Sequence, residues 1–223
     1  MSGYCDFAPG HPLHGPYHDT EYGFPQRDES VLFERLLLEI NQAGLSWETI
    51  LRKRDGFRRA YGGFDVDAVA AYGASDVARL LADPGIIRNR LKVAAAIHNA
   101  QVIHGFRASH GGFARWLDAN ARDEHGKARD KASWVKLFKR TFRFTGGEIT
   151  GEFLMSLGIL PGAHRPDCPV MKKIARIRRA GRAMDDKSIT IGRSRASPHP
   201  RPRKRSGPLA RPEIEAFGRR ISP

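Results

Sequence analysis

Both cysteines of this 223-residue chain have histidines near them, and the two groups lie far apart in the sequence. Cys5 precedes His18 near the start, and His164 precedes Cys168 by four residues. Two thiolates and two imidazoles form the tetrahedral set that holds Zn²⁺ in closed structural sites. Two further histidines compete with His18 as a ligand: His11 and His14. A disulfide or two buried thiols are the alternatives; if the four residues meet, one ion joins the two ends of the folded region.

A carboxylate and a large aromatic side chain lie close together where one predicted helix ends and the next begins. Glu39 lies seven residues after Leu32, at the edge of an apolar helix face where an unpartnered charge is costly. Gly44 interrupts that helix, and Trp47 follows at the start of the next. One negative charge and one aromatic face in a common pocket would bind a flat cation. In the alternative interpretation, Trp47 is ordinary core and Glu39 pairs with an arginine such as Arg52 or Arg54.

A predicted hairpin at residues 80–92 carries a second chemical signal. Gly85 lets backbone amides approach a ligand closely, and the helix start that follows presents free N–H groups that favour an anion. Three basic residues add positive charge beside this turn: Arg88, Arg90 and Lys92. Such charge is typical of elements that contact DNA phosphates. A solvated basic helix face is the alternative.

The elements that must position these residues are predicted to be helices, because apolar residues follow helical spacing almost throughout residues 28–160. One helix begins at Asp28 and another at Ser46; Ser75 is expected to cap a third. Asp83-Pro84-Gly85 separates that helix from a long one extending through Ile103. Further helices are expected at residues 65–72, 112–120, 133–142 and 147–157. The predicted fold class is all-α.

The positive charge is concentrated at the carboxyl end. Residues 172–223 contain 16 Lys and Arg against 4 Asp and Glu, so they contribute +12 of the formal net charge of +14. From Ser188 onward the chain is rich in Arg, Pro and Ser, which predicts disorder. We therefore expect a helical domain at residues 1–171 and a basic, largely disordered tail at residues 172–223. The tail either attracts phosphates or has no specific role.

Composition also predicts where the protein resides. Hydrophobic residues make up 40% of the chain, enough for a sizeable core. No apolar stretch approaches membrane-spanning length, and the first residues lack the apolar region of a signal peptide. The expectation is a cytoplasmic protein with no membrane partner, where reduced cysteines favour metal ligation over a disulfide.

Three stretches together resemble one family, DNA-3-methyladenine glycosylase I, a zinc-bearing branch of the helix-hairpin-helix glycosylases. These stretches are Tyr17-His-Asp-Thr-Glu-Tyr-Gly23, Leu38-Glu-Ile-Asn-Gln-Ala-Gly-Leu-Ser-Trp47 and Gly85-Ile-Ile-Arg-Asn-Arg90. The spacing His164-x-x-x-Cys168 completes the zinc pattern of the family with Cys5. The resemblance covers about residues 3–171 and implies a helix-hairpin-helix domain whose two termini are joined by one structural zinc ion.

The resemblance implies a role for each matching residue. The zinc ligands would be Cys5, His18, His164 and Cys168, with no coordination position left open. Glu39 would be the carboxylate that contacts the base. The other pocket residues would be Tyr17, Trp47, Phe7 and Tyr22. Contacts to DNA would come from Gly44, Leu45, Gly85, Arg88, Arg90 and Lys92, with Gly44 and Leu45 filling the gap left by the extruded nucleotide.

The implied activity is hydrolysis of the N-glycosidic bond of 3-methyladenine in double-stranded DNA by a monomeric enzyme, which starts base excision repair. A methyl group on N3 makes adenine cationic, so the bond is already weakened and selection of the flipped base can carry catalysis. No lyase step is expected, because no lysine occupies a recognisable nucleophile position after the hairpin. The alternatives are a non-catalytic zinc-stabilised DNA-binding module and a catalytic zinc site, which a full ligand set disfavours.

The sequence also departs from the family pattern. Phe7 and Tyr22 stand where the family usually has tryptophan. The segment Gly147–Met155 differs from the best-known members, and we expect Glu148 and Thr150 from this segment to line the pocket. These departures indicate a divergent subgroup, and they leave open whether 3-methylguanine is also removed.

Overall fold

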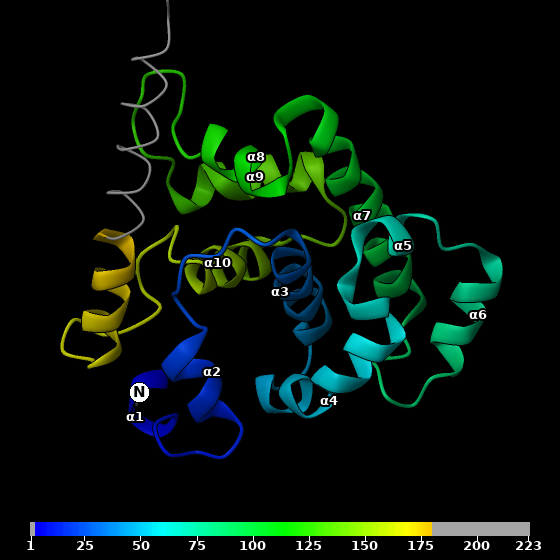
Figure 1. Ribbon diagram of the computed structural model, residues 1–223, viewed down its shortest axis with the longest axis horizontal. Helices are drawn as coiled ribbons and strands as arrows, with labels where there is room; N and C mark the ends of the chain where they lie inside the picture. Colours follow the sequence, from blue (N-terminus) through cyan, green and yellow to red (C-terminus); the bar gives the residue numbers. More distant parts are fainter. Residues whose placement is uncertain (1–2, 180–223) are drawn as a thin grey trace, which may run out of the picture. The chain divides into compact units, whose positions relative to one another are not determined.

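The computed structural model describes residues 3–179, which form helices and connecting turns (Figure 1). The helices are α1 (Tyr4–Phe7), α2 (His14–Thr20), α3 (Glu29–Gln42), α4 (Trp47–Ala60), η1 (Gly62–Phe64), α5 (Val66–Ala70), α6 (Ala74–Ala82), α7 (Arg90–His110), α8 (Phe113–Ala119), α9 (Lys131–Thr141) and α10 (Gly147–Ser156). Residues 170–179 are also helical. Within the described range the only β-type pairing is one isolated bridge between Arg122 and Ala128, so the all-α prediction is confirmed.

Helix α3 forms the centre of the molecule and packs against α4, α7, α8 and α10. Asp28 begins it by accepting hydrogen bonds from the amides of Ser30 and Val31, as the sequence predicts. Residues Leu32 to Asn41 are all buried, including Glu34, Arg35 and Glu39. The helix therefore carries charged side chains into the interior, and these need partners or a function.

Stacked aromatic rings fill the space between α3 and helices α7 to α10. The rings of Phe106 and Trp116 lie 4.7 Å apart at an interplanar angle of 7°, and those of Phe113 and Phe153 lie 6.0 Å apart at 6°. Phe113 and Phe153 are fully buried. The second pair joins α8 to α10, and α8 and α10 each pack against α3. The position of α10 matters because α3 and α10 both contribute to the site described below.

The predicted hairpin lies between α6 and α7, and the residue that caps the start of α6 differs from the prediction. Ser75 lies inside α6 and is not its cap: the helix begins after Gly73, whose amide donates to the Asp76 carboxylate at 3.1 Å. An acid three residues into a helix can satisfy the amide of the capping residue when that residue itself has no side chain. At the other end of the hairpin, Asn89 caps α7 by accepting from the amides of Leu91 and Lys92.

The first helices, α1 and α2, lie beside the segment that ends the described chain (Figure 1, blue and yellow). A small apolar cluster joins them, in which Cys5 and Phe24 pack against Cys168, Val170 and Ile174. The sequence predicts a largely disordered tail at residues 172–223, but residues 172–179 continue a helix. The rest of the predicted tail lies outside the described residues. No helix in the described range is long and apolar enough to cross a membrane.

Candidate functional site

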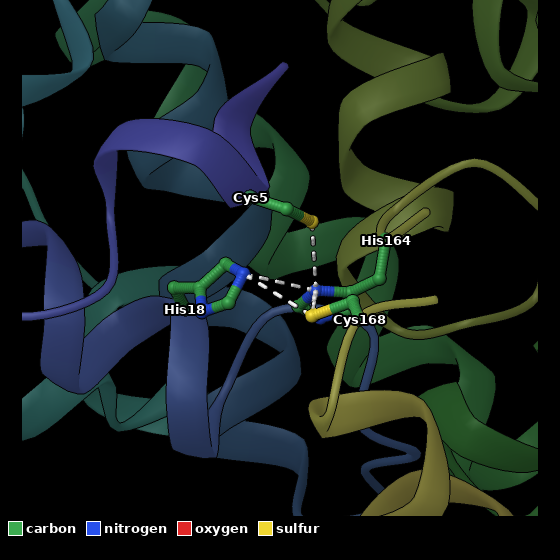
Figure 2. Close-up of side chains that lie close together, drawn as sticks. All are labelled: Cys5, His18, His164 and Cys168. Carbon is green, nitrogen blue, oxygen red and sulfur yellow. Dashed lines mark hydrogen bonds between the residues drawn. The ribbon is translucent and has the colours of Figure 1, made fainter. Parts of the chain in front are cut away.

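The two cysteines and two of the nearby histidines meet in space (Figure 2). Helix α1 supplies Cys5 and α2 supplies His18, while His164 and Cys168 come from the turns after α10. Their ligand atoms all lie within 4.8 Å of one another. We call these four residues the Cys₂His₂ cluster. Within the described residues it is the one group of three or more potential ligands close enough to hold a metal ion, and His11 and His14 lie outside it.

The distances within the Cys₂His₂ cluster fit a tetrahedral ion. The facing nitrogens of His164 and His18 are 3.2 Å apart, and the Cys168 sulfur is 3.7 Å from each of them. The Cys5 sulfur is 3.6 Å from His164 Nδ1. Tetrahedral Zn²⁺ with ordinary bond lengths would place two nitrogens about 3.4 Å apart, and nitrogen and sulfur about 3.6 Å apart. Neither cysteine forms a disulfide, so both sulfur atoms are available as ligands and the cluster could hold a metal ion.

The outward-facing ring nitrogens of both histidines have acceptors. His18 Nδ1 lies 2.7 Å from the Asp19 carboxylate, and His164 Nε2 lies 2.7 Å from the main-chain oxygen of Tyr22. Such partners fix the tautomer and turn the other nitrogen toward the metal. Because His164 holds Tyr22 through its main chain, the Cys₂His₂ cluster also fixes a residue of the neighbouring pocket.

That pocket has a volume of about 270 Å³ and lies between α1, α2, α3, α4 and α10. We call it the inner pocket, and it is lined by Tyr4, Tyr17, Tyr22, Glu39, Gln42, Trp47 and Glu152. The Tyr17 ring lies 5.1 Å from Trp47 and 5.7 Å from Tyr22. The indole nitrogen of Trp47 is buried and has no hydrogen-bond partner within residues 3–179. Aromatic walls with a free donor and acidic groups suit a flat, polar, cationic ligand.

Glu39 is 4% exposed and makes no hydrogen bond or ion pair with any described residue. Burial raises the pKa of Glu39 well above its ordinary value, the charge of Glu152 raises it further, and the charge of Arg35 lowers it. Arg35 does not pair with Glu39, because its Nη1 donates to the main-chain oxygen of Ser156 at 2.6 Å. A buried carboxyl group without a partner is costly for the fold, so its position indicates a ligand.

The arginines proposed as alternative partners of Glu39 pair elsewhere. Arg52 binds Glu48 one turn away on α4. Arg54 binds Glu21 through two hydrogen bonds of 2.7 Å and Glu34 through one of 2.8 Å. The interpretation of Glu39 as half of a structural ion pair is therefore wrong.

A second hollow opens beside the inner pocket, with a volume of about 490 Å³. We call it the outer hollow; it shares Glu39, Gln42 and Glu152 with the inner pocket. The turn between α3 and α4 forms one wall, where Gly44 has a φ of +82° and Leu45 is 41% exposed. The start of α10 forms the other wall. Leu45 thus exposes an apolar side chain on a tight turn beside the inner pocket.

Two of the three basic residues predicted to contact DNA from the hairpin are exposed, and the third is buried. Arg88 and Arg90 are exposed. Lys92 is buried, and its ammonium donates to the main-chain oxygens of Asn41 and Ala43 at 2.8 and 2.7 Å. Because these bonds close the end of α3, the expectation that Lys92 adds charge to the hairpin surface is wrong.

The backbone of Gly85 packs directly against α4 at Gly56. A Cβ atom on Gly56 of α4 would lie 2.3 Å from the main-chain oxygen of Gly85, so the two backbones touch. The Gly85 amide donates to the Asp83 carboxylate at 2.7 Å and is already bonded within the protein. The expectation that the Gly85 amide binds an anion is therefore not supported. It is the missing side chain of Gly56 that lets the hairpin lie against α4.

Of the aromatic residues predicted to line the inner pocket, Tyr17, Tyr22 and Trp47 do so and Phe7 does not. Phe7 is 50% exposed, and its ring packs edge-to-face with that of Tyr4, with the ring centroids 5.2 Å apart. Tyr4 takes the place expected for Phe7. Tyr4 and Phe7 are the first and last residues of a helix of four residues, so the sequence could not decide which of the two rings faces the pocket.

Three residues that line the inner pocket were not predicted as site residues: Tyr4, Gln42 and Glu152. Gln42 lies in the glutamate-to-tryptophan stretch, three residues after Glu39, so helical spacing could have placed it on the same face. From the divergent segment, Glu148 lines the outer hollow and not the inner pocket. Thr150 is fully buried, and its hydroxyl has no partner in the described part of the chain, so it does not reach either cavity.

Comparisons with known proteins agree on one family. The Methyladenine glycosylase family matches residues 7–172. DNA-3-methyladenine glycosylase 1 of Escherichia coli (strain K12) is 36% identical over 169 residues, which cover 70% of this chain and 90% of that protein. DNA-3-methyladenine glycosylase of Haemophilus influenzae (strain ATCC 51907 / DSM 11121 / KW20 / Rd) is 32% identical over 186 residues, covering 76% and 98%.

Solved structures are similar over the same region. A crystal structure of a tyrosine-to-phenylalanine variant of 3-methyladenine DNA glycosylase I in complex with 3-methyladenine is 30% identical and superposes with a TM-score of 0.66. The match covers 76% of this chain and 97% of that one. The enzyme from Staphylococcus aureus, solved to explain 3-methyladenine recognition, is 31% identical with a TM-score of 0.65 and coverages of 75% and 95%.

Proposed function

The chain belongs to the Methyladenine glycosylase family, and we propose that it is a monofunctional DNA glycosylase that hydrolyses the N-glycosidic bond of 3-methyladenine in alkylated DNA. The observation that carries this function is the buried, unpaired carboxyl group of Glu39 in an aromatic pocket. The relatives it matches are named for the same activity.

The residues of the inner pocket explain how a methylated base is selected. A methyl group on N3 gives adenine a positive charge that ordinary adenine lacks. The faces of Trp47 and Tyr17 attract that cation, and the Glu39 carboxylate adds a direct charge interaction. Neutral adenine gains neither, so unmodified bases that enter the pocket are released.

The bond that breaks joins the ring nitrogen of the base to the sugar carbon. Its electron pair goes to the base, which neutralises the charge of the methylated ring and needs no protonating acid. The sugar carbon becomes electron-poor and takes the oxygen of water, which loses a proton. The reaction therefore needs the protein to extrude, bind and orient the nucleotide. The proposal includes no lyase step; the ammonium group of Lys92, beside the hairpin, donates to the main-chain oxygens of Asn41 and Ala43.

Zinc is the ion that fits the Cys₂His₂ cluster, because two thiolates and two imidazoles at these separations match its bond lengths and geometry. All four positions would be taken by protein, so the ion would stabilise the fold and leave no open position for water. Cys5, His18, His164 and Cys168 would thus join α1 and α2 to the end of the domain and hold the main chain of Tyr22 at the pocket.

The partner is double-stranded DNA bound by a monomer in the bacterial cytoplasm. Leu45 on its tight turn would enter the space left by the extruded nucleotide, next to the pocket that receives the base. Arg88 and Arg90, exposed on the hairpin, would contact phosphates. The arginine-rich stretch beyond residue 179 would add an electrostatic attraction that weakens with salt.

The direct test is release of bases from methylated DNA. The full-length protein is incubated with DNA treated with a methylating agent, and the released bases are separated by chromatography beside a 3-methyladenine standard. We expect 3-methyladenine as the main product, and the same assay shows whether 3-methylguanine is released. A protein that binds the duplex but releases no base would be a DNA-binding module, contrary to the proposal.

A further inference from the structure

The inner pocket contains a second carboxylate, Glu152, that the predicted site did not include. Helix α10 supplies it, whereas α3 supplies Glu39, so two separate elements each direct one acid to the same cavity. The hydroxyl of Tyr22 donates to Glu152 Oε2 at 2.9 Å. No other hydrogen bond or ion pair to Glu152 is present within residues 3–179. One oxygen is therefore oriented by the protein, and the other is free to contact a ligand.

Neither acid forms an ion pair with a cation of the described residues, although the charge of nearby Arg35 acts on Glu39. Arg35 lies on α3 one turn before Glu39, but its Nη1 is committed to the main-chain oxygens of Ser156 and Phe24. Among the seven lining residues of the inner pocket, none is basic. Two carboxyl groups that share one aromatic cavity, one of them 4% exposed and unpaired, form a site that a cation would complete.

Resting on the proposed function, we propose that Glu152 is a second base-contacting carboxylate, positioned by Tyr22, that narrows the substrate class to purine cations. Each carboxylate adds attraction for a ring that carries positive charge and adds little for a neutral ring of the same shape. Glu152 lies in the segment Gly147–Met155, whose sequence departs from the pattern of the best-known family members. The pocket would discriminate between charged and neutral bases more strongly than one carboxylate allows.

The test compares two ligands that differ in charge and by one methyl group. In 3,9-dimethyladeninium both N3 and N9 carry methyl groups, so the ring is a permanent cation that mimics the substrate base. In 9-methyladenine the ring is neutral. Isothermal titration calorimetry on the full-length protein gives the dissociation constant of each, and their ratio measures the preference for the cation. The variants are Glu152→Gln, which removes the charge at nearly constant shape, and Tyr22→Phe, which removes the hydroxyl that orients it.

In the Glu152→Gln protein the ratio of the two dissociation constants, which measures the preference for the cation, is expected to fall roughly tenfold. The reason is that one charge near the ligand is removed from a partly buried site. Tyr22→Phe should lose less, because the carboxylate remains but is no longer oriented. The matched control is Glu124→Gln, which removes one charge from a side chain that is 87% exposed and does not line the pocket. The ratio of dissociation constants for this variant should equal that of the wild type.

An unchanged ratio in Glu152→Gln would overturn the inference, and so would a wild-type protein that binds both ligands equally. If Glu152→Gln fails to fold by circular dichroism, Glu152→Asp and Tyr22→Phe decide: a ratio unchanged in both would contradict a role for this carboxylate. The base-release assay separates the two proposals. A protein that releases 3-methyladenine yet shows no effect of Glu152→Gln keeps the proposed function and loses only this inference.

Discussion

Among single residues, Glu39 combines a contribution to binding with a cost to stability. Its pKa in the folded protein is raised above the unfolded value, mainly by burial. A group of this kind stabilises the fold fully below its unfolded pKa, and that stability is lost as the pH rises through the folded pKa. We therefore expect Glu39→Gln to melt at a higher temperature than the wild type at pH 8, by about 2–4 °C for each kcal/mol gained. Differential scanning calorimetry measures it.

The same substitution should weaken base capture while leaving nonspecific DNA binding nearly intact. The matched control is Glu48→Gln, which removes an exposed carboxylate paired with Arg52 on α4. Its melting temperature should differ little from the wild type, since ion pairs exposed to solvent contribute little to stability. A Glu39→Gln protein with full glycosylase activity would show that the pocket is assigned wrongly.

The raised pKa of Glu39 also predicts the acid limb of the pH profile. A protonated Glu39 cannot attract a cation, so kcat/KM for 3-methyladenine release should rise as the pH rises through the pKa of this group. The groups that face it are Glu152 from α10, Arg35 from α3 and Tyr17 from α2. Because burial and the charge of Glu152 both raise this pKa, the midpoint should lie above the ordinary glutamate value of 4.5.

Removing the second acid should move that midpoint in a known direction. In Glu152→Gln the charge that raises the pKa of Glu39 is absent, so the acid limb should shift to lower pH. Profiles of kcat/KM between pH 4 and 8 on the same DNA substrate would show the shift. A limb that moves upward or stays in place would mean that the two acids do not interact.

The sequence identified those site residues whose chemical type is unusual for their position. Glu39 on an apolar helix face and two cysteines with histidine neighbours are conspicuous without coordinates. Glu152 was not predicted, because an acid in a helix is ordinary until the rotation of α10 and the position of Tyr22 are known. Phe7 was predicted to line the pocket in place of Tyr4, which lies three positions earlier in the same four-residue helix. Apolar periodicity shows which side of a helix faces the interior only when the helix is longer than this.

Among the helices, the end of α3 depends on a contact from α7. Lys92 Nζ donates to the carbonyl oxygens of Asn41 and Ala43, just before the turn that carries Gly44 and Leu45. Replacing Lys92 by Met keeps the apolar stem but leaves two carbonyl groups without this donor. We expect a loss of about 1.5–3 kcal/mol in the free energy of unfolding, the range for a hydrogen bond to a charged group. Urea denaturation followed by circular dichroism measures it.

Arg90→Met is the matched control for this substitution, because Arg90 is exposed at the start of the same helix. It should leave the free energy of unfolding nearly unchanged while weakening binding to duplex DNA and reducing its dependence on salt. The opposite result, with Arg90→Met unfolding easily and Lys92→Met behaving as wild type, would contradict the assignment of one residue to the fold and the other to DNA.

Helix positions were predicted well, because long amphipathic segments and Asp28 and Ser46 as caps are local signals. The short helices α1 and α2 were missed, since neither is long enough to show a period. The close contact of Gly56 with Gly85 was also out of reach, because it depends on how α4 and the hairpin approach each other in space.

For the whole molecule, the Cys₂His₂ cluster joins the first helices of the domain to its last segment and, through His164 and the Tyr22 carbonyl, to the inner pocket. A bound zinc ion adds its binding free energy to folding, because the unfolded chain has no preformed site. A strong chelator should therefore lower the melting temperature of the full-length protein, and a thiol reductant alone should not. A disulfide between Cys5 and Cys168 would produce the reverse pattern.

Cys168→Ser, which removes one ligand, should melt as low as the chelated wild type and respond little to further chelator. The fluorescence of Trp47 should report the effect of ion loss on the inner pocket. The Tyr17 ring packs against Trp47, and Tyr17 precedes His18 of the Cys₂His₂ cluster in α2. Loss of the ion should therefore change tryptophan fluorescence at temperatures below the main unfolding transition. If zinc by elemental analysis is absent from the purified protein and chelator leaves both signals unchanged, the cluster holds no structural metal.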